Sequence, residues 1–399
     1  MPDLTSLAAS HEHELVALRR VLHSQPELSG AEHVTTEMLV ERLMVEGLAP
    51  VVLSTGTGLV CDIVMDPHDT GRSADGPIVA IRADIDALAM DDRTDTPYRS
   101  RHSGIAHACG HDVHTAAVLG AGLLLLEARD AEPRAGTVRL VFEPSEEVVP
   151  GGAVDVIADG WLDGVREIFG VHCDPKTDVG SLGLRSGPLT SAADMFEITL
   201  TGPGGHTARP GLTVDLVRWT GRVADRLADV VQSRTQRDVT LVFGAVHSGA
   251  AANVIPATAL LRGSFRTPDR DAWLEGEALM RAALGDILAA DGGAAPEWAL
   301  AYTRGVPPVV NDERTTAVVE RVATSLFGAG SVTDTPQSRG GDSFAWYTEQ
   351  IPGTYVRLGT HRPGNPHQDL HSATFDVDEG AIAVAAALLA GCALESLRA

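Results

Sequence analysis

Apolar residues recur every three or four positions between residues 12 and 48, which is the spacing of helices with one buried face. Leu15 and Leu22 follow this spacing in the first half of the segment, and Leu39 and Leu43 follow it in the second. The pattern predicts two amphipathic helices separated by a proline.

Short apolar runs then alternate with helical patterns. The runs cover 51–53, 58–64, 78–81, 138–142 and 167–171, and the helical patterns cover 115–129 and 151–158. Such alternation is typical of an α/β layer with a largely parallel sheet. A longer apolar stretch at 381–394 contains Gly391 and is shorter than the roughly 20 residues that cross a bilayer, so it predicts a buried helix.

The pattern changes near residue 187 to that of a β-α-β-β-α-β, ferredoxin-like module. Its predicted strands are 194–201, 239–246, 257–266 and 297–303, and its predicted helices are 213–233 and 273–290. Because a helix at 312–326 and a strand at 355–358 follow it, we expect the module to be inserted into the first domain. The predicted domains are therefore 1–186 with 301–399, and 187–300.

Composition excludes some partners. The chain of 399 residues has 31 Lys and Arg against 54 Asp and Glu, a formal charge of −23, which opposes binding to nucleic acids and to anionic membranes. The four cysteines lie far apart, unlike the dense disulfide frameworks of small secreted domains. The N-terminal segment also lacks the features of a signal peptide, so we expect a cytoplasmic protein.

The segment His107-Ala-Cys109-Gly-His111-Asp112-Val-His114 contains more metal-binding groups than any other stretch of the chain. Cys109 and His111 are two positions apart and can project from one side of an extended or turned backbone, toward one ion at about 2.0–2.3 Å. This spacing favours a metal site. A surface loop with unrelated histidines, or an inert buried Cys109, is the alternative.

Four further patches carry metal-binding or proton-transfer groups, each at a predicted strand end or turn. They are Arg82-Ala-Asp84-Ile-Asp86, Glu143-Pro-Ser-Glu146-Glu147, Gly170-Val-His172 and Asp369-Leu-His371. Open α/β sheets place their sites at strand-to-helix transitions. Taken singly, each patch is more often structural, since an adjacent glutamate pair is usually solvated and a lone histidine is usually a satisfied structural residue.

The order of these motifs resembles that of peptidase family M20. After the histidine cluster come Phe142-Glu-Pro-Ser-Glu-Glu147, Gly170-Val-His172 and Gly204-Gly-His206-Thr-Ala-Arg-Pro210. The amidohydrolase branch, whose enzymes act on N-acyl, hippurate-type and auxin-conjugate amino acids, is the most similar, and the resemblance runs from residues 22–28 to 371–379. It implies a metal-binding α/β/α catalytic domain with an inserted lid and dimerisation domain, and therefore a homodimer.

The resemblance assigns two divalent ions to this chain, with Glu146 as the general base. The implied ligands are Cys109, His111, Glu147, His172 and His371. A thiolate and a carboxylate offset the repulsion between two cations, and this donor set suits Zn²⁺, Mn²⁺, Co²⁺ or Ni²⁺.

Three neighbouring residues have expected or open roles. Asp86 is expected to support a ligand from behind. Asp112 and His114 either do the same or are ordinary turn and cap residues.

Three residues of the inserted module are assigned to substrate by the same resemblance. His206 stabilises the oxyanion from the partner subunit, while Asn253 and Arg266 bind the substrate carboxylate and carbonyl. Two segments depart from the family pattern, 148–152 and 341–344, so the pocket is expected to differ in shape.

The expected reaction is hydrolysis of an N-acyl amino acid, such as an N-acetyl or N-benzoyl derivative, to a carboxylic acid and a free amino acid. A dipeptidase or metallocarboxypeptidase of the same fold is the alternative, and it differs in needing a pocket for a free amino group. A metal-free binding protein that has kept the fold is a third possibility, against which the complete set of ligand residues argues.

Overall fold

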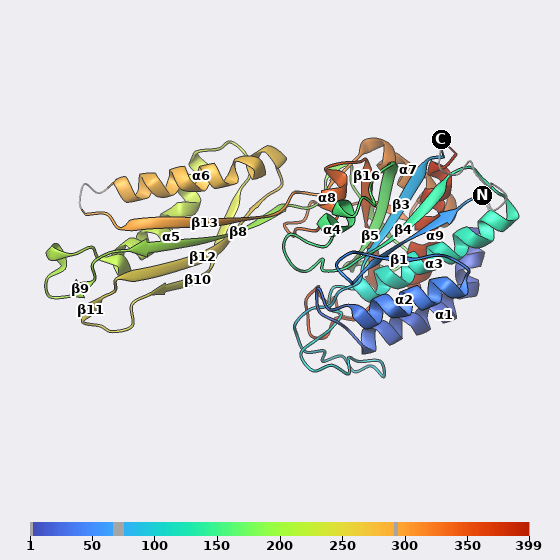
Figure 1. Ribbon diagram of the computed structural model, residues 1–399, viewed down its shortest axis with the longest axis horizontal. Helices are drawn as coiled ribbons and strands as arrows, with labels where there is room; N and C mark the ends of the chain where they lie inside the picture. Colours follow the sequence, from blue (N-terminus) through green and yellow to red (C-terminus); the bar gives the residue numbers. More distant parts are fainter. Residues whose placement is uncertain (1–2, 67–75, 291–293, 399) are drawn as a thin grey trace. The chain divides into compact units, whose positions relative to one another are not determined.

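The computed structural model describes residues 3–66, 76–290 and 294–398 (Figure 1). The chain forms two compact units. The first comprises Met1–Leu189, Val310–Pro336 and Ser343–Ala399, and the second comprises Thr190–Val309 and Gln337–Asp342.

The first unit is built on an eight-stranded mixed sheet with the order β1-β2-β4-β3-β5-β16-β6-β15. The strands are β1 (Val51–Val52), β2 (Leu59–Val64), β3 (Ile78–Asp84), β4 (Thr137–Glu143), β5 (Val165–Asp178), β6 (Leu182–Leu184), β15 (Val332–Asp334) and β16 (Gly353–His361). The four central strands β4, β3, β5 and β16 run parallel. Every residue of β4 is buried, as expected for a parallel strand covered on both faces.

Seven helices accompany this sheet in the described residues. They are α1 (Leu4–Ser24), α2 (His33–Val45), α3 (His111–Ala131), α4 (Ala153–Ala158), α7 (Glu313–Phe327), α8 (Ala345–Thr348) and α9 (Gly380–Ser396). Helices α1, α3 and α9 pack against one another. Helix α9 is the predicted apolar helix, and it is buried along most of its length. None of the helices in the described ranges combines the length and the apolar character needed to cross a membrane.

The parallel strands bring the predicted patches to one edge of the sheet. Asp84 at the end of β3 lies in register with Glu143 at the end of β4, and Arg82 lies in register with Gly170 on β5. His172 follows Gly170 by two positions on β5. The acidic patches and this histidine therefore meet where the strands end, as expected for an α/β sheet.

Helix α3 begins at His111, four residues before the predicted start. Gly110 precedes it with φ of +91°, a left-handed conformation that glycine adopts without a side-chain penalty. A Cβ at this position would lie 2.6 Å from Cys173 Sγ. Gly110 therefore turns the chain between Cys109 and His111 and packs it directly against β5.

The second unit contains a four-stranded antiparallel sheet with the order β10-β12-β8-β13 and two helices. Its main elements are β8 (Ala192–Thr201), α5 (Leu216–Ser233), β10 (Thr240–Ser248), β12 (Thr258–Thr267), α6 (Arg270–Ala289) and β13 (Glu297–Val306). The predicted boundary at 300 lies inside β13, which pairs with β8 as far as Val306. The unit consequently continues to Val309.

Two short ladders complete the fold. They join β9 (Gly205–His206) to β11 (Val254–Ile255), and β7 (Gly187–Pro188) to β14 (Val310–Asn311). A single 3₁₀ turn, η2, covers Pro210–Leu212.

Asp194 on β8 is a fully buried carboxylate that ties the second unit together. It accepts hydrogen bonds from Trp273 Nε1 at 2.8 Å, the Gly305 amide at 2.7 Å and the Tyr302 hydroxyl at 2.6 Å. Burial, together with the charge of Asp194, raises the pKa of Tyr302, so its phenol stays protonated as a donor. One carboxylate thereby links β8, α6 and β13.

We predict that Asp194→Ala lowers the free energy of unfolding by about 3–5 kcal/mol, because it removes the acceptor of three hydrogen bonds, two of them from the buried Trp273 and Gly305. Glu197→Ala on the same strand removes only an exposed ion pair with Arg262 and should cost less than about 0.5 kcal/mol. Urea unfolding followed by tryptophan fluorescence measures both. Equal effects of the two variants would show that the Asp194 contacts contribute little.

Candidate metal centre

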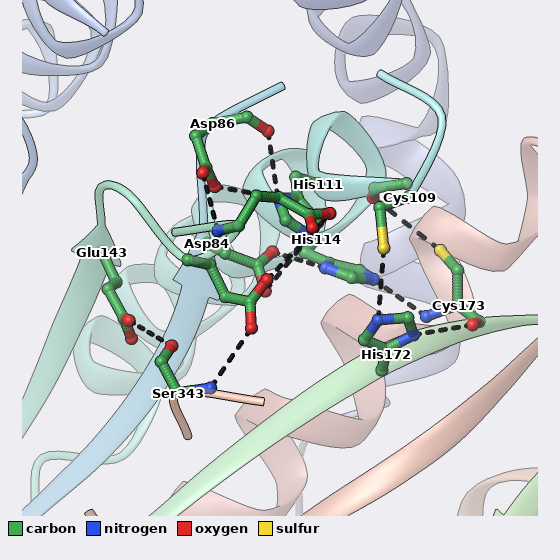
Figure 2. Close-up of polar contacts among 12 residues, drawn as sticks. Asp84, Asp86, Cys109, His111, His114, Glu143, His172, Cys173 and Ser343 are labelled. Atoms are coloured by element: carbon green, nitrogen blue, oxygen red, sulfur yellow. Dashed lines mark hydrogen bonds and ion pairs between the residues drawn. The ribbon is translucent and has the colours of Figure 1, made fainter. Parts of the chain in front are cut away.

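Donor atoms from five segments of the first unit gather in overlapping groups, each with its atoms within 4.8 Å of one another. The groups are Cys109, His111 and His172; Cys109, Glu147 and His371; His111, Glu146 and Glu147; and Asp84, His111 and His114. Figure 2 shows Cys109, His111 and His172 facing one another from the start of α3 and from β5. The structure thus brings together all six residues that the sequence assigned to this domain.

Hydrogen bonds fix the tautomers of two of the histidines. His111 Nδ1 lies 2.9 Å from the Asp86 carbonyl oxygen and 3.1 Å from Asp86 Oδ1, so this nitrogen carries the proton. His172 Nδ1 donates in the same way to the Cys173 carbonyl at 2.8 Å. In the neutral rings each Nε2 then presents a lone pair to the donor group, which is the arrangement that a metal-binding imidazole requires. Burial opposes the charged form of His111, but Asp84 and Cys109 raise its pKa well above the usual range, so a cation bound there takes the place of a second proton on this ring.

The distances between donor atoms fit a metal ion. Two ligands bound tetrahedrally at about 2.0–2.3 Å lie about 3.3–3.8 Å apart. Cys109 Sγ is 3.5 Å from His172 Nε2, and Glu147 Oε1 is 3.3 Å from His371 Nε2 and 3.8 Å from His111 Nε2. The buried His111 Nε2 has no hydrogen-bond partner among the described residues, and a cation would satisfy it.

Burial sets the charge of two donors. It raises the pKa of the Cys109 thiol well above its usual range, and with Arg357 nearby it lowers the pKa of His172 well below its usual range. His172 is therefore neutral, as a ligand must be. A thiol in such a place loses its proton when a cation lies beside it.

His114 is not available as a ligand, although it belongs to one of the groups. The Cys173 amide donates to His114 Nε2 at 2.9 Å, so Nδ1 carries the proton and donates to Asp84 Oδ1 at 2.6 Å. Both ring nitrogens are thus occupied. Burial acts against the charge of Asp84, but His111, Arg82 and His114 together hold the pKa of this carboxyl well below its usual range.

Asp112 also has a supporting position. It is completely buried next to His111 in the sequence and accepts hydrogen bonds from Arg19 Nε at 2.7 Å and His23 Nδ1 at 2.8 Å. Asp112 therefore ties the start of α3 to α1, while His114 ties it to Asp84 on β3 and to Cys173 on β5.

Asp86 connects the two sides of the site. Besides accepting a hydrogen bond from His111 Nδ1 through Oδ1, it accepts a hydrogen bond from the Glu147 amide at 2.9 Å through Oδ2. Figure 2 shows dashed lines that join Asp86 to His111. The expectation that Asp86 supports a neighbouring residue from behind agrees with these contacts.

Two residues at the site have strained backbones. Ser145 and His371 both have φ of +57°, and they are the non-glycine residues with positive φ in the described parts of the chain. Such a conformation costs about 1–3 kcal/mol and persists where the surroundings impose it. His371 is held by its amide, which donates to the Ala108 carbonyl at 2.7 Å.

A buried ionic network beneath Glu146 was not expected from the sequence. Arg82 donates to Glu143 Oε2 at 2.6 Å, Asp84 Oδ2 at 2.7 Å and Ser343 Oγ at 3.0 Å. The Ser343 amide in turn donates to Glu146 Oε1 at 3.2 Å. An arginine directly after the apolar run at 78–81 was the available signal, because a buried charge needs partners of opposite sign.

The second unit holds the three residues assigned to substrate. His206 on β9 pairs with Val254 on β11, directly after Asn253, whose carbonyl accepts the Thr207 amide at 3.3 Å. Both side chains are exposed. Arg266 lies near the opposite end of β12 and donates to the Arg339 carbonyl at 2.8 Å, so the structure does not bring it to the other two.

The tautomer of His206 suits a hydrogen-bond donor. The Ala208 amide donates to His206 Nδ1 at 3.0 Å. In the neutral imidazole the proton then lies on Nε2, so this exposed side chain presents an N–H group.

Comparison with known proteins identifies the family. The model of peptidase family M20/M25/M40 matches residues 80–395, which is more than half of the chain. The chain belongs to peptidase family M20. This membership confirms the resemblance found in the motifs, and it places the chain in a family of hydrolases.

Relatives of M20 type share both sequence and fold with this chain. A Bacillus subtilis (strain 168) protein named N-acetyl-L-cysteine deacetylase is 37% identical over 93% of this chain and 85% of its own. The solved structure of the Bacillus subtilis YXEP protein, described as a dinuclear metal-binding peptidase from the M20 family, is 32% identical, with a TM-score of 0.82 over 98% of this chain and 99% of that one. The predicted α/β fold class is thereby confirmed.

A third relative is a longer protein. The chain is 42% identical, over 93% of its length, to a Rhodococcus jostii (strain RHA1) protein named as a glutamate–cysteine ligase. It spans 45% of the length of that protein.

We predict that Cys109→Ala and His111→Ala each lower the metal-to-protein ratio after reconstitution with Zn²⁺ or Mn²⁺, because each removes a donor shared by two groups or more. Elemental analysis after gel filtration measures this ratio. Cys61→Ala is the matched control, since Cys61 is equally buried but lies in the hydrophobic core. Wild-type metal content in Cys109→Ala would exclude this thiol as a ligand.

Proposed function

We propose that this protein is a metal-dependent amidohydrolase that cleaves the amide bond of N-acyl amino acids with water, giving a carboxylic acid and a free amino acid. The observation that carries the proposal is the buried cluster in which Cys109 belongs to two donor groups while Glu146 stands beside it. The name of the Bacillus subtilis deacetylase points to the same substrate class.

Cys109, His111, Glu147, His172 and His371 would hold two divalent ions. The sharing of Cys109 between two groups supports a pair of ions, as does the dinuclear description of the YXEP protein. Divalent ions bound there supply positive charge that polarises the amide carbonyl and promotes ionisation of water. The thiol and imidazole donors suit Zn²⁺, Mn²⁺, Co²⁺ or Ni²⁺.

Glu146 is the proposed general base, and its contacts differ from those of its neighbour. Glu147 lies close to both His111 and His371, whereas Glu146 Oε1 accepts the Ser343 amide and its Oε2 lies 4.0 Å from His111 Nε2. Glu146 takes a proton from the attacking water and passes it to the leaving amine as the carbon–nitrogen bond breaks. His206 donates through Nε2–H to the oxyanion that develops on the carbonyl oxygen.

Asn253 and Arg266 are proposed to bind the carboxylate and carbonyl of the substrate, and the second unit is proposed to act as a lid and to pair two subunits. The exposure of His206 and Asn253 on one short ladder supports a joint role in binding. Arg266 has the weaker support, because it lies apart from them and already donates to a backbone carbonyl.

A cytoplasmic location is proposed from the four cysteines. Cys61, Cys109, Cys173 and Cys392 are all buried and free. Free thiols of this kind fit a reducing compartment.

A substrate panel tests the proposal and separates it from the alternative. The protein is reconstituted with each of the four metals and assayed with N-acetyl-L-cysteine, other N-acetyl and N-benzoyl amino acids, and dipeptides with a free amino group. We expect hydrolysis of the N-acyl compounds. Turnover of the dipeptides alone would establish the dipeptidase or carboxypeptidase alternative, and no hydrolysis with any metal would refute the proposal.

We predict that Glu146→Gln lowers kcat by at least about 10²-fold, the lower end for loss of general acid–base catalysis, while metal content stays near that of the wild type. Glu147→Gln should lower metal content instead. Elemental analysis and steady-state kinetics on the same preparations separate the two effects. Reversal of the two results would exchange the roles of the glutamates.

We predict that His206→Ala lowers kcat by about 10²–10³-fold without loss of metal, since one donor to an oxyanion is worth this much. If subunits pair and His206 serves the partner, mixing His206→Ala with Glu146→Gln subunits restores part of the activity, because one site of each mixed dimer regains both groups. Proven subunit exchange without recovered activity would exclude that His206 acts on the partner subunit.

A further inference from the structure

The left-handed backbone of Ser145 sets the direction of the glutamate pair. Ser145 stands between Pro144 and Glu146, and its φ of +57° turns the chain immediately before the two acidic side chains. A serine in this conformation returns to an extended backbone unless something holds it. The holding group therefore controls where Glu146 points.

Glu32 is that holding group. It is completely buried, and its Oε1 accepts the Ser145 amide at 2.7 Å and lies 3.5 Å from Ser145 Oγ. The two residues are 113 positions apart in the chain. Ser145 Oγ also lies 3.8 Å from the position that a Cβ on Gly30 would occupy, so the segment around Glu32 approaches Ser145 closely.

The backbone of Glu32 is itself fixed. Glu32 precedes α2, and its carbonyl accepts both the Thr36 amide at 3.0 Å and the Thr36 hydroxyl at 2.6 Å. The Thr36 hydroxyl in turn accepts the Gly58 amide at 2.9 Å. The Glu32 carboxylate thus contacts Ser145 from the N-terminus of α2, where the backbone is held by hydrogen bonds.

The segment that contains Glu32 also supports Glu147. Ser29 Oγ donates to Asp86 Oδ2 at 2.7 Å, and the same oxygen accepts the Glu147 amide. None of the residues of this segment has a role in the proposed reaction. Its hydrogen bonds go to the Ser145 amide and to Asp86, which in turn accepts the Glu147 amide.

We propose that Glu32 is a positioning residue, which holds Ser145 in its left-handed conformation and thereby aims Glu146 at the attacking water. This inference rests on the proposed function, in which Glu146 is the base. Glu32 does not touch the substrate or the donor groups.

Kinetics of Glu32→Ala, Glu32→Gln and a matched control test the proposal with N-acetyl-L-cysteine as substrate. We expect Glu32→Ala to lower kcat about tenfold, which corresponds to about 1.4 kcal/mol, with little change in KM or metal content. Glu32→Gln keeps an oxygen that accepts the Ser145 amide and should retain most of the activity. Glu27→Ala is the control, because Glu27 accepts the Val34 and Thr35 amides of α2 at 3.0 and 2.8 Å and its side chain makes no hydrogen bond with Ser145.

The Glu27→Ala control separates the orientation of Glu146 from the stability of α2. Both alanine variants should lower the melting temperature, but only Glu32→Ala should lower kcat. If the two variants lower the melting temperature equally and neither changes kcat, Glu32 only stabilises α2 and the proposal is wrong.

Rescue provides a second measurement. Glycine reaches positive φ without a side-chain penalty, so adding Ser145→Gly to Glu32→Ala should restore kcat at least about threefold. A Ser145→Gly substitution that gives no recovery would contradict the proposal.

Hydrogen exchange provides a measurement that does not depend on activity. In the metal-free protein, Glu32→Ala should speed exchange in the peptide that contains Ser145, while Glu27→Ala should leave it unchanged. Faster exchange together with full activity of Glu146→Gln would overturn the assignment of the base and leave the hold on Ser145 intact. Unchanged exchange in Glu32→Ala would overturn the hold itself.

Discussion

The carboxylate of Asp86 is the contact on which the geometry of the site depends. One of its oxygens accepts a hydrogen bond from His111 Nδ1, and the other accepts hydrogen bonds from the Glu147 amide and the Ser29 hydroxyl. The end of β3, the start of α3 and the acidic loop after β4 are joined at this one buried group. Because it fixes the tautomer of His111, it also decides which nitrogen of that ring is free.

Burial of the charged groups around the metal centre costs solvation free energy, and it restricts each group to positions where a partner of opposite sign is present. Charged groups at the ends of β3 and β4 lie out of contact with water, where each is stable only with partners of opposite sign. Arg82 balances Asp84 and Glu143, and Arg19 balances Asp112. The donor atoms of His111 and Cys109 stand out from this pattern, since the described protein groups leave the His111 nitrogen without a hydrogen bond. The charged residues around the site are therefore paired with one another, whereas the His111 nitrogen at its centre is available to a cation.

The sequence predicted those parts of the fold that depend on local pattern. A helical pattern located α3, an unbroken apolar stretch located α9, and short apolar runs located β3 and β4, because each of these elements is buried along most of its length. The three-residue strands β6 and β15 were not predicted, since so short a segment carries no period. Helix α1 begins at Leu4, earlier than expected, because Asp3 accepts the Ser6 amide and starts it.

The identities of the donors could be read from motifs, but the roles of their neighbours could not. Whether His114 binds or supports depends on the Cys173 amide, which lies 59 positions away. The hold of Glu32 on Ser145 spans 113 positions and depends on a backbone angle that no composition reveals. The spacing of residues in the sequence thus identifies the candidate donor residues, while hydrogen bonds between distant parts of the chain decide how their side chains are oriented.

Gly110 shows how a position without any functional group can be as constrained as a ligand. Its positive φ disfavours every other residue, and the sulfur of Cys173 occupies the space where a side chain would begin. A redesign that exchanges Cys109 or His111 to change metal preference must therefore keep the glycine between them, because any side chain there would collide with Cys173. The position that carries no chemistry constrains the choice of donors on either side of it.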